Sequence, residues 1–189
     1  ALAAAPALAQ PAFVDVTPMS NPWWVTDATH DFWVASLAPA DVDGDGDLDL
    51  AALGSLVDYE VGAQEALLVF VNQGPGLDGH WQFDTQEVPL GDLYSGASAL
   101  AWGDFDRDGD PDLAVGSEGL TRLYRNDGGQ LAPIPAALPG YWEDSTYDMA
   151  YDLRSLSWAD TDNDGDLDLL IPSVWDADLF EFSTRLMRN

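Results

Sequence analysis

The chain has 189 residues, of which 47% are hydrophobic and eight are tryptophan, so it can fold around a sizeable core. Its 34 Asp and Glu against six Lys and Arg give a formal net charge of -28, which would repel nucleic acid and anionic membrane surfaces and leaves cations as the natural partner. The absence of cysteine excludes disulfides and thiol redox chemistry.

Residues 1–12 (ALAAAPALAQPA) form an Ala-rich leader, in which Ala7, Leu8 and Ala9 have the small-x-small form of a signal-peptidase site. We interpret the leader as the residual end of an export signal, with a disordered Ala/Pro segment as the alternative. No run of about 18 apolar residues occurs, so no membrane-spanning helix is expected. The sequence therefore predicts a soluble protein that is secreted, periplasmic or at the cell surface.

Three segments share one pattern, in which an acidic run stands between two apolar runs; they start at Leu37, Leu100 and Leu156. Each is followed by a second shared signal, which is LLVFVNQGPG, TRLYRNDGGQ or STRLMRN. Short apolar or alternating stretches bounded by Gly, Asn, Asp and Pro are typical of β-strands, and no longer stretch has a helical period. The predicted fold is all-β, with repeats of about 60 residues that match propeller blades of four antiparallel strands. Trp102 and Trp158, just before two of the acidic runs, are expected in the core.

Each acidic run has aspartate at positions 1, 3, 5, 7 and 9 and glycine at position 6. The runs are loop 1 (41–49), loop 2 (104–112) and loop 3 (160–168), and their aspartates are Asp41, Asp43, Asp45, Asp47 and Asp49, then Asp104, Asp106, Asp108, Asp110 and Asp112, then Asp160, Asp162, Asp164, Asp166 and Asp168. A Ca²⁺ ion takes six to eight oxygen ligands, and alternation points the carboxylates of positions 1, 3 and 5 inward. Glycine permits the turn that brings in the position 7 carbonyl, while the side chain of position 7 stays free and position 9 closes the cage.

The spacing therefore predicts about three structural Ca²⁺ ions, one in each loop. Solvated turns are the alternative, since Asp and Gly dominate turns, but the glycine and the following apolar strand recur in all three runs. Mg²⁺ fits less well because it demands a stricter octahedron and keeps its waters. A catalytic metal is not expected, because the runs lack histidine and leave no open coordination position.

The pattern D-x-D-x-D-G-D-x-D between two strands, followed by RLYRNDGG, resembles the FG-GAP or VCBS repeat of integrin-α-like β-propellers. The resemblance covers residues 13–189 and implies that the acidic loop joins the first two strands of each blade and binds structural Ca²⁺. It also implies a ring of about seven blades, so three loops indicate a fragment. The stretch FVDVT, Phe13 to Thr17, resembles the outermost strand of a blade and could instead close a smaller ring.

The connections before the three repeats combine aromatic with acidic residues. Candidate ligand-binding residues there are Trp23, Trp24, His30, Tyr94, Trp142 and Tyr147. Aromatic rings mixed with acids suit stacking on a sugar or anchoring a protein, although such rings also fill gaps between blades.

The sequence favours a binding or adhesion module with a protein or carbohydrate partner, and it assigns no catalytic residue. One alternative is a polysaccharide lyase or hydrolase that uses acids such as Asp27, Asp31, Glu143 or Asp144. The other is a scaffold subunit whose propeller is completed by another chain.

Overall fold

The computed structural model describes residues 30–60, 62–77, 79, 81–91, 99–117, 120–135, 138, 155–176 and 181–189. The 1–12 leader and the FVDVT stretch lie outside these residues. The described residues form three antiparallel sheets and no helix, which confirms the all-β prediction. In particular, they include no helix that is long and apolar enough to cross a membrane.

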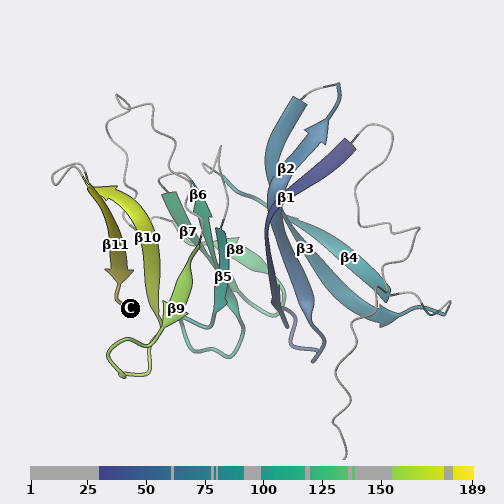
Figure 1. The fold of residues 1–189 in the computed structure, drawn as a ribbon. Helices are drawn as coiled ribbons and strands as arrows, with labels where there is room; N and C mark the ends of the chain where they lie inside the picture. Colours follow the sequence, from purple (N-terminus) through teal and green to yellow (C-terminus); the bar gives the residue numbers. More distant parts are fainter. Residues whose placement is uncertain are drawn as a thin grey trace, which may run out of the picture.

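Each sheet is a meander in which consecutive strands pair (Figure 1). Sheet 1 contains β1 (His30–Ala40), β2 (Asp49–Asp58), β3 (Gly62–Pro75) and β4 (Trp81–Val88). Sheet 2 contains β5 (Ala99–Gly103), β6 (Asp112–Ser117), β7 (Leu120–Asn126) and β8 (Leu131–Pro133), and sheet 3 contains β9 (Ser157–Ala159), β10 (Asp168–Asp176) and β11 (Glu181–Met187). The four-stranded repeat is thus confirmed for sheets 1 and 2, whereas the described part of sheet 3 has three strands.

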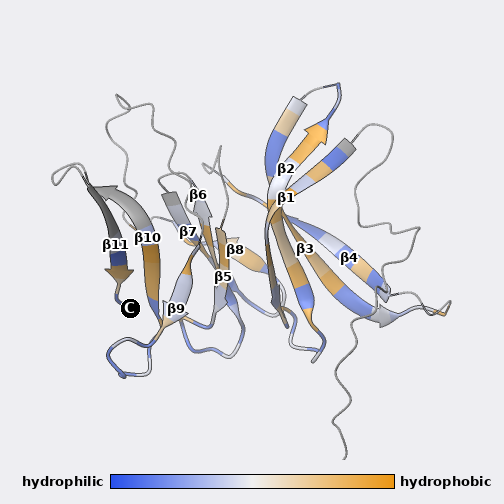
Figure 2. Cartoon of the chain, in the orientation of Figure 1, coloured by the Kyte–Doolittle hydropathy of each residue, from blue (hydrophilic) through white to orange (hydrophobic). Residues whose placement is uncertain are grey.

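The burial of each strand depends on its position in the sheet. The second strand of sheet 2, β6 with the sequence DLAVGS, is buried at every residue because a sheet covers it on both faces. The edge strand β4, WQFDTQEV, is mostly exposed. Figure 2 shows the same contrast, with apolar stretches within the strands and hydrophilic connections at their ends.

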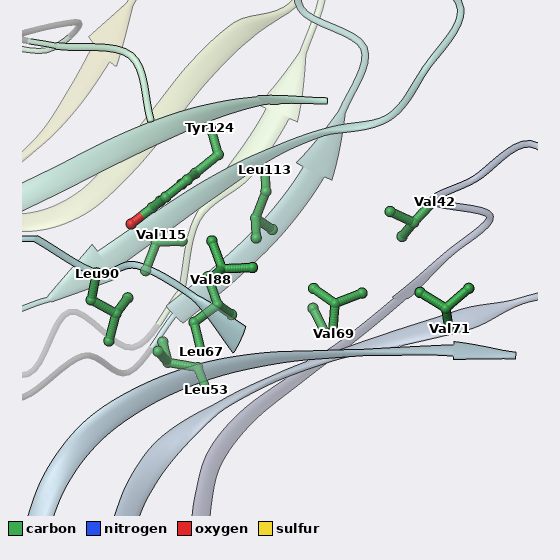
Figure 3. Packing of buried hydrophobic residues seen from close by; sticks show 11 residues of the cluster. Val42, Leu53, Leu67, Val69, Val71, Val88, Leu90, Leu113, Val115 and Tyr124 are labelled. Atoms are coloured by element: carbon green, nitrogen blue, oxygen red, sulfur yellow. The ribbon is translucent and has the colours of Figure 1, made fainter. Parts of the chain in front are cut away.

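The sheets pack face to face in chain order. Leu53, Leu67 and Val69 of sheet 1 meet Leu113 and Tyr124 of sheet 2 in one apolar cluster (Figure 3). A second cluster joins sheet 2 to sheet 3. It contains Ala99, Ala114, Leu123, Leu156, Leu169 and Ile171.

Two tryptophans join neighbouring sheets by hydrogen bonds as well as by packing. The Trp102 indole N–H donates to the Ala38 carbonyl of sheet 1 at 2.9 Å, and Trp158 donates to Ala101 of sheet 2 at 3.1 Å. Both rings are partly buried against the apolar clusters, which confirms their predicted place at the core. Each indole therefore satisfies its donor while it holds two sheets in register.

Candidate metal centres

The three acidic loops occupy equivalent positions, because each connects the first two strands of its sheet. Loop 1 joins β1 to β2, loop 2 joins β5 to β6, and loop 3 joins β9 to β10. In every loop, one carboxylate oxygen from each of positions 1, 3 and 5 lies within 4.8 Å of the other two. The structure thus brings together the nine aspartates predicted as the inward-facing ligands, which are Asp41, Asp43 and Asp45, Asp104, Asp106 and Asp108, and Asp160, Asp162 and Asp164.

Glycine at position 6 allows the sharp turn that the sequence predicted. Gly46, Gly109 and Gly165 have φ of 96°, 103° and 93°, in a region that residues with a Cβ rarely adopt. Each glycine N–H donates to the Oδ2 atom of position 1, at 3.0, 3.1 and 3.1 Å. The turn therefore folds back onto its own first carboxylate.

Position 4 is also left-handed in all three loops, and the sequence analysis did not identify this feature. Its occupants are Gly44, Arg107 and Asn163, with φ of 76°, 61° and 61°. Glycine and asparagine adopt this conformation readily, but arginine does so at a cost. Because the residue type varies, the sequence pattern carries no signal for it.

Backbone donors hold the carboxylates in place. The N–H of position 7 donates to Oδ1 of position 5 in each loop, at 2.9 to 3.0 Å. In loops 2 and 3 the N–H of position 5 donates to Oδ1 of position 1, at 3.1 and 3.2 Å. The side-chain orientations thus follow from the fold of the loop itself.

In loop 1, the Oδ1 atom of Asp41 is buried and has no hydrogen-bond partner. A buried carboxylate oxygen without a donor is costly, and a cation would satisfy it. The raised pKa of Asp43 is consistent with this, since partial loss of solvation and then the carboxylates of Asp45, Asp49 and Asp41 disfavour its charge. The donor set and its charge therefore fit a hard divalent cation that binds through oxygen.

The position 9 aspartates have a structural role that the sequence did not predict. Asp49, Asp112 and Asp168 are 1%, 0% and 3% exposed, and each accepts from two backbone segments. One oxygen takes the N–H of loop position 2 (Val42, Phe105 or Thr161, at 2.7, 3.1 and 3.2 Å). The other takes the N–H of an asparagine near the end of the third strand (Asn72, Asn126 or Asn189, at 2.7, 2.9 and 3.1 Å).

This pair of hydrogen bonds, called the staple below, links the acidic loop to the third strand near its end. The position 9 carboxylates are not among the oxygens that converge at positions 1, 3 and 5. Oδ2 of Asp168 also accepts from the Thr161 hydroxyl, but the other oxygens keep a second lone pair, so the ligand role of position 9 stays a prediction. The surroundings of position 9 also change its pKa. Burial raises the pKa of Asp112, whereas hydrogen bonds from the Thr161 hydroxyl and then from the Asn189 and Thr161 amides lower the pKa of Asp168.

The expectation that position 7 side chains stay free is wrong for two of the three loops. The Asp110 carboxylate accepts the N–H of Gly128 at 2.8 Å, which ties loop 2 to the turn after β7. Asp166 forms an ion pair with Arg107 of loop 2. These side chains therefore connect loops to their surroundings, which the linear pattern could not show because both partners are remote in the chain.

The predicted ligand-binding residues lie largely beyond the described part of the chain. Trp23, Trp24, Tyr94, Trp142 and Tyr147 are outside it, and of His30 only the backbone, at the start of β1, is described. The candidate acids Asp27, Glu143 and Asp144 are outside it too, while Asp31 accepts a hydrogen bond from the Tyr59 hydroxyl.

Three exposed aromatic side chains on sheet 1 were missed by the sequence analysis. Trp33 of β1 is 71% exposed, Tyr59, which follows β2, is 66% exposed, and Trp81 of β4 is 48% exposed. The local signal was weak, because an aromatic residue in a strand is more often a packing residue.

Comparison with known proteins agrees with the geometry. None of the curated proteins compared with the chain is significantly similar to it. The model of the FG-GAP-like repeat matches residues 56–115 and 104–171, so the two matches together extend over more than half of the chain. The second match contains all of loop 2 and all of loop 3, between the strands where the repeat pattern places them. The chain therefore belongs to the FG-GAP-like repeat family.

Proposed function

We propose that the protein is a calcium-stabilised β-propeller module, with one Ca²⁺ in each acidic loop, that acts by binding a partner. The observation that carries the metal assignment is the convergence of three carboxylate oxygens at three equivalent loops. Three like charges at this separation repel one another, and a divalent cation turns that repulsion into attraction. The donor set favours Ca²⁺ over softer metals, because all of its side-chain ligands are carboxylates.

The ions act structurally rather than catalytically. In each loop, backbone amides hold the carboxylates in place, and histidine, a common ligand of catalytic zinc, is absent from the three clusters. Each loop connects the first two strands of its sheet, so a bound ion would stabilise the hairpin that these strands form.

The sheet packing supports a propeller. Successive antiparallel meanders pack face to face, and their first strands β1, β5 and β9 are neighbours across the interfaces. Blades around a common axis have this arrangement. We infer that the three sheets are part of a larger ring, which the chain builds with further blades or with another chain.

Partner binding is supported by the surface of sheet 1. Trp33 and Tyr59 expose large aromatic rings, and Asp31 beside Tyr59 provides hydrogen-bond acceptors. Exposed aromatics with polar neighbours suit a protein or a neutral sugar, whereas the net charge of -28 disfavours anionic ligands. Export, which the leader suggests, would place these loops where extracellular Ca²⁺ is abundant.

Metal-dependent stability tests the first part of the proposal. Metal-stripped protein is titrated with CaCl₂ in a calorimeter and melted with CaCl₂, MgCl₂ or chelator. We expect about three Ca²⁺ per chain, and stabilisation of about 3 kcal/mol per site when free Ca²⁺ is a hundred times the dissociation constant. The matched control carries Asp43→Asn, Asp106→Asn and Asp162→Asn, one change in each triad, and should lose the Ca²⁺ response. An unchanged melting temperature in chelator would overturn the assignment.

Glycan-array and protein-capture assays, made with Ca²⁺ present, test the second part. Binding without turnover supports a binding module, and Trp33→Ala with Tyr59→Ala should weaken it. Release of reducing or unsaturated sugar ends would replace this function with an enzymatic one.

A further inference from the structure

We propose that Asn126 and Asn189 are positioning residues for the cation loop of the preceding sheet, so that each loop is completed by the sheet that follows it. This inference rests on the proposed cation binding and adds residues that are not ligands. Loop 1 would depend on sheet 2, and loop 2 on sheet 3.

The contacts of Asn126 link two sheets. Its backbone N–H donates to Asp112 of its own sheet at 2.9 Å, and its side-chain oxygen accepts the Gly129 N–H at 2.9 Å. Its side-chain Nδ2 donates to the Val42 carbonyl of loop 1 at 2.7 Å. The residue is fully buried, so this bond between the sheets is shielded from water.

Asn189 repeats the arrangement one sheet later. Its backbone N–H donates to Asp168 at 3.1 Å, and its Nδ2 donates to the Phe105 carbonyl of loop 2 at 2.6 Å. The two asparagines are 63 residues apart, as are Val42 and Phe105. The repetition indicates a built feature of the repeat rather than a single chance contact.

Position 2 of the loop is where the two sheets meet. The N–H of Val42 donates to Asp49 at 2.7 Å, while its carbonyl accepts from Asn126, so position 2 is held from its own sheet and from the next one. Phe105 is held in the same way and its ring stacks on Trp158 of sheet 3, with 5.8 Å between ring centroids. Positions 1 and 3, which supply carboxylates to the triad, flank this residue directly. Fixing position 2 therefore limits the freedom of two ligands.

Asn72 of sheet 1 provides a natural control. It makes the same bond to position 9 of its own sheet, Asp49, and its side-chain oxygen accepts the Gly74 N–H at 2.9 Å. Its Nδ2, however, donates to the carbonyl of Leu48, position 8 of loop 1 of its own sheet, at 3.3 Å. Replacing Asn72 thus removes the local contacts without removing a bond between sheets.

The test is a Ca²⁺ titration of the full chain followed by NMR, in which the amide resonances of Gly46, Gly109 and Gly165 report loops 1, 2 and 3 separately. Asn126→Ala should weaken Ca²⁺ binding at Gly46 about threefold to tenfold, the worth of one net hydrogen bond, and leave Gly109 unchanged. Asn189→Ala should weaken binding at Gly109 and leave Gly46 unchanged. Asn72→Ala should leave binding at Gly109 and Gly165 unchanged, because its side-chain bonds are to loop 1 and β3 of its own sheet.

The expected effect falls on the loop of the preceding sheet and spares the loop of the mutated sheet. This difference distinguishes a positioning role from general destabilisation. If Asn126 acted through its own sheet, Asn126→Ala would instead weaken Ca²⁺ binding at Gly109. A general loss of stability would weaken Ca²⁺ binding at all three glycines. Either result overturns the inference but leaves the proposed cation binding intact. If no resonance of the unaltered protein responds to Ca²⁺, the proposed function itself fails. If Asn126→Ala does not fold, Asn126→Ser, whose shorter side chain does not reach Val42, takes its place.

Discussion

Replacing Asp112 with alanine should destabilise the protein even without metal. Asp112 is fully buried, and its two oxygens accept the N–H groups of Phe105 and Asn126 at 3.1 and 2.9 Å. Alanine leaves the buried Asn126 donor and the partly buried Phe105 donor without an acceptor, at about 1 to 3 kcal/mol each. Part of that cost is offset, because burial and then the nearby Asp106 and Asp108 already disfavour the charge of Asp112 and raise its pKa.

We therefore expect a net loss of about 3 kcal/mol in the free energy of unfolding. For a chain of this size, that loss lowers the melting temperature by about 6 to 12 °C. The assay is thermal and urea unfolding of metal-stripped protein, followed by circular dichroism.

Asp106→Ala is the matched control, because it also removes one carboxylate from loop 2 but at an exposed position. It should change metal-free stability by less than about 0.5 kcal/mol and reduce only the increment that Ca²⁺ adds. If Asp112→Ala melts within about 1 °C of the parent without metal, the staple contributes nothing and position 9 matters only as a ligand.

Three further predictions concern the loops and the sheet interface. Gly46→Ala should cost about 1 to 2 kcal/mol because its φ of 96° disfavours a Cβ, whereas Gly44→Asn should be tolerated; equal urea midpoints for the two variants would contradict this. In metal-stripped protein the free energy of unfolding should rise as the pH falls from about 7 to about 4.5. The pKa values of Asp43 and Asp112 are raised in the folded state, whereas the aspartate pKa of the unfolded chain is 3.8. The folded state therefore binds protons at a higher pH than the unfolded chain and gains stability from them. With saturating Ca²⁺ the stability should instead fall as the pH falls, since protons compete with Ca²⁺ for the carboxylates. Urea midpoints measured at both pH values, with and without Ca²⁺, test this. Trp158→Phe should cost about 1 to 2 kcal/mol by removing an indole donor between sheets 2 and 3, and a melting temperature equal to the parent's would refute that role.

Much of the fold could be predicted because its signals are local and repeated. The alternation of apolar and turn residues indicates strands, and three copies of one acidic run place the loops between the first two strands of each sheet. The role of glycine at position 6 could be predicted, since few other residues adopt its backbone conformation. Position 4 could not, because Gly44, Arg107 and Asn163 have no shared chemistry.

The chemistry of the loops could be predicted from the residues alone: the residue types, their spacing, the glycine turn and the side chains at positions 1, 3 and 5 that converge. These depend on neighbours within one short loop, where few backbone conformations are possible. Three features depend on how the sheets pack: position 9 is buried and bonded to two backbone segments, Arg107 pairs with Asp166, and Asn126 reaches the preceding sheet. Those contacts join residues from different strands or sheets, so they exist only once the sheets have packed and water has been excluded between them.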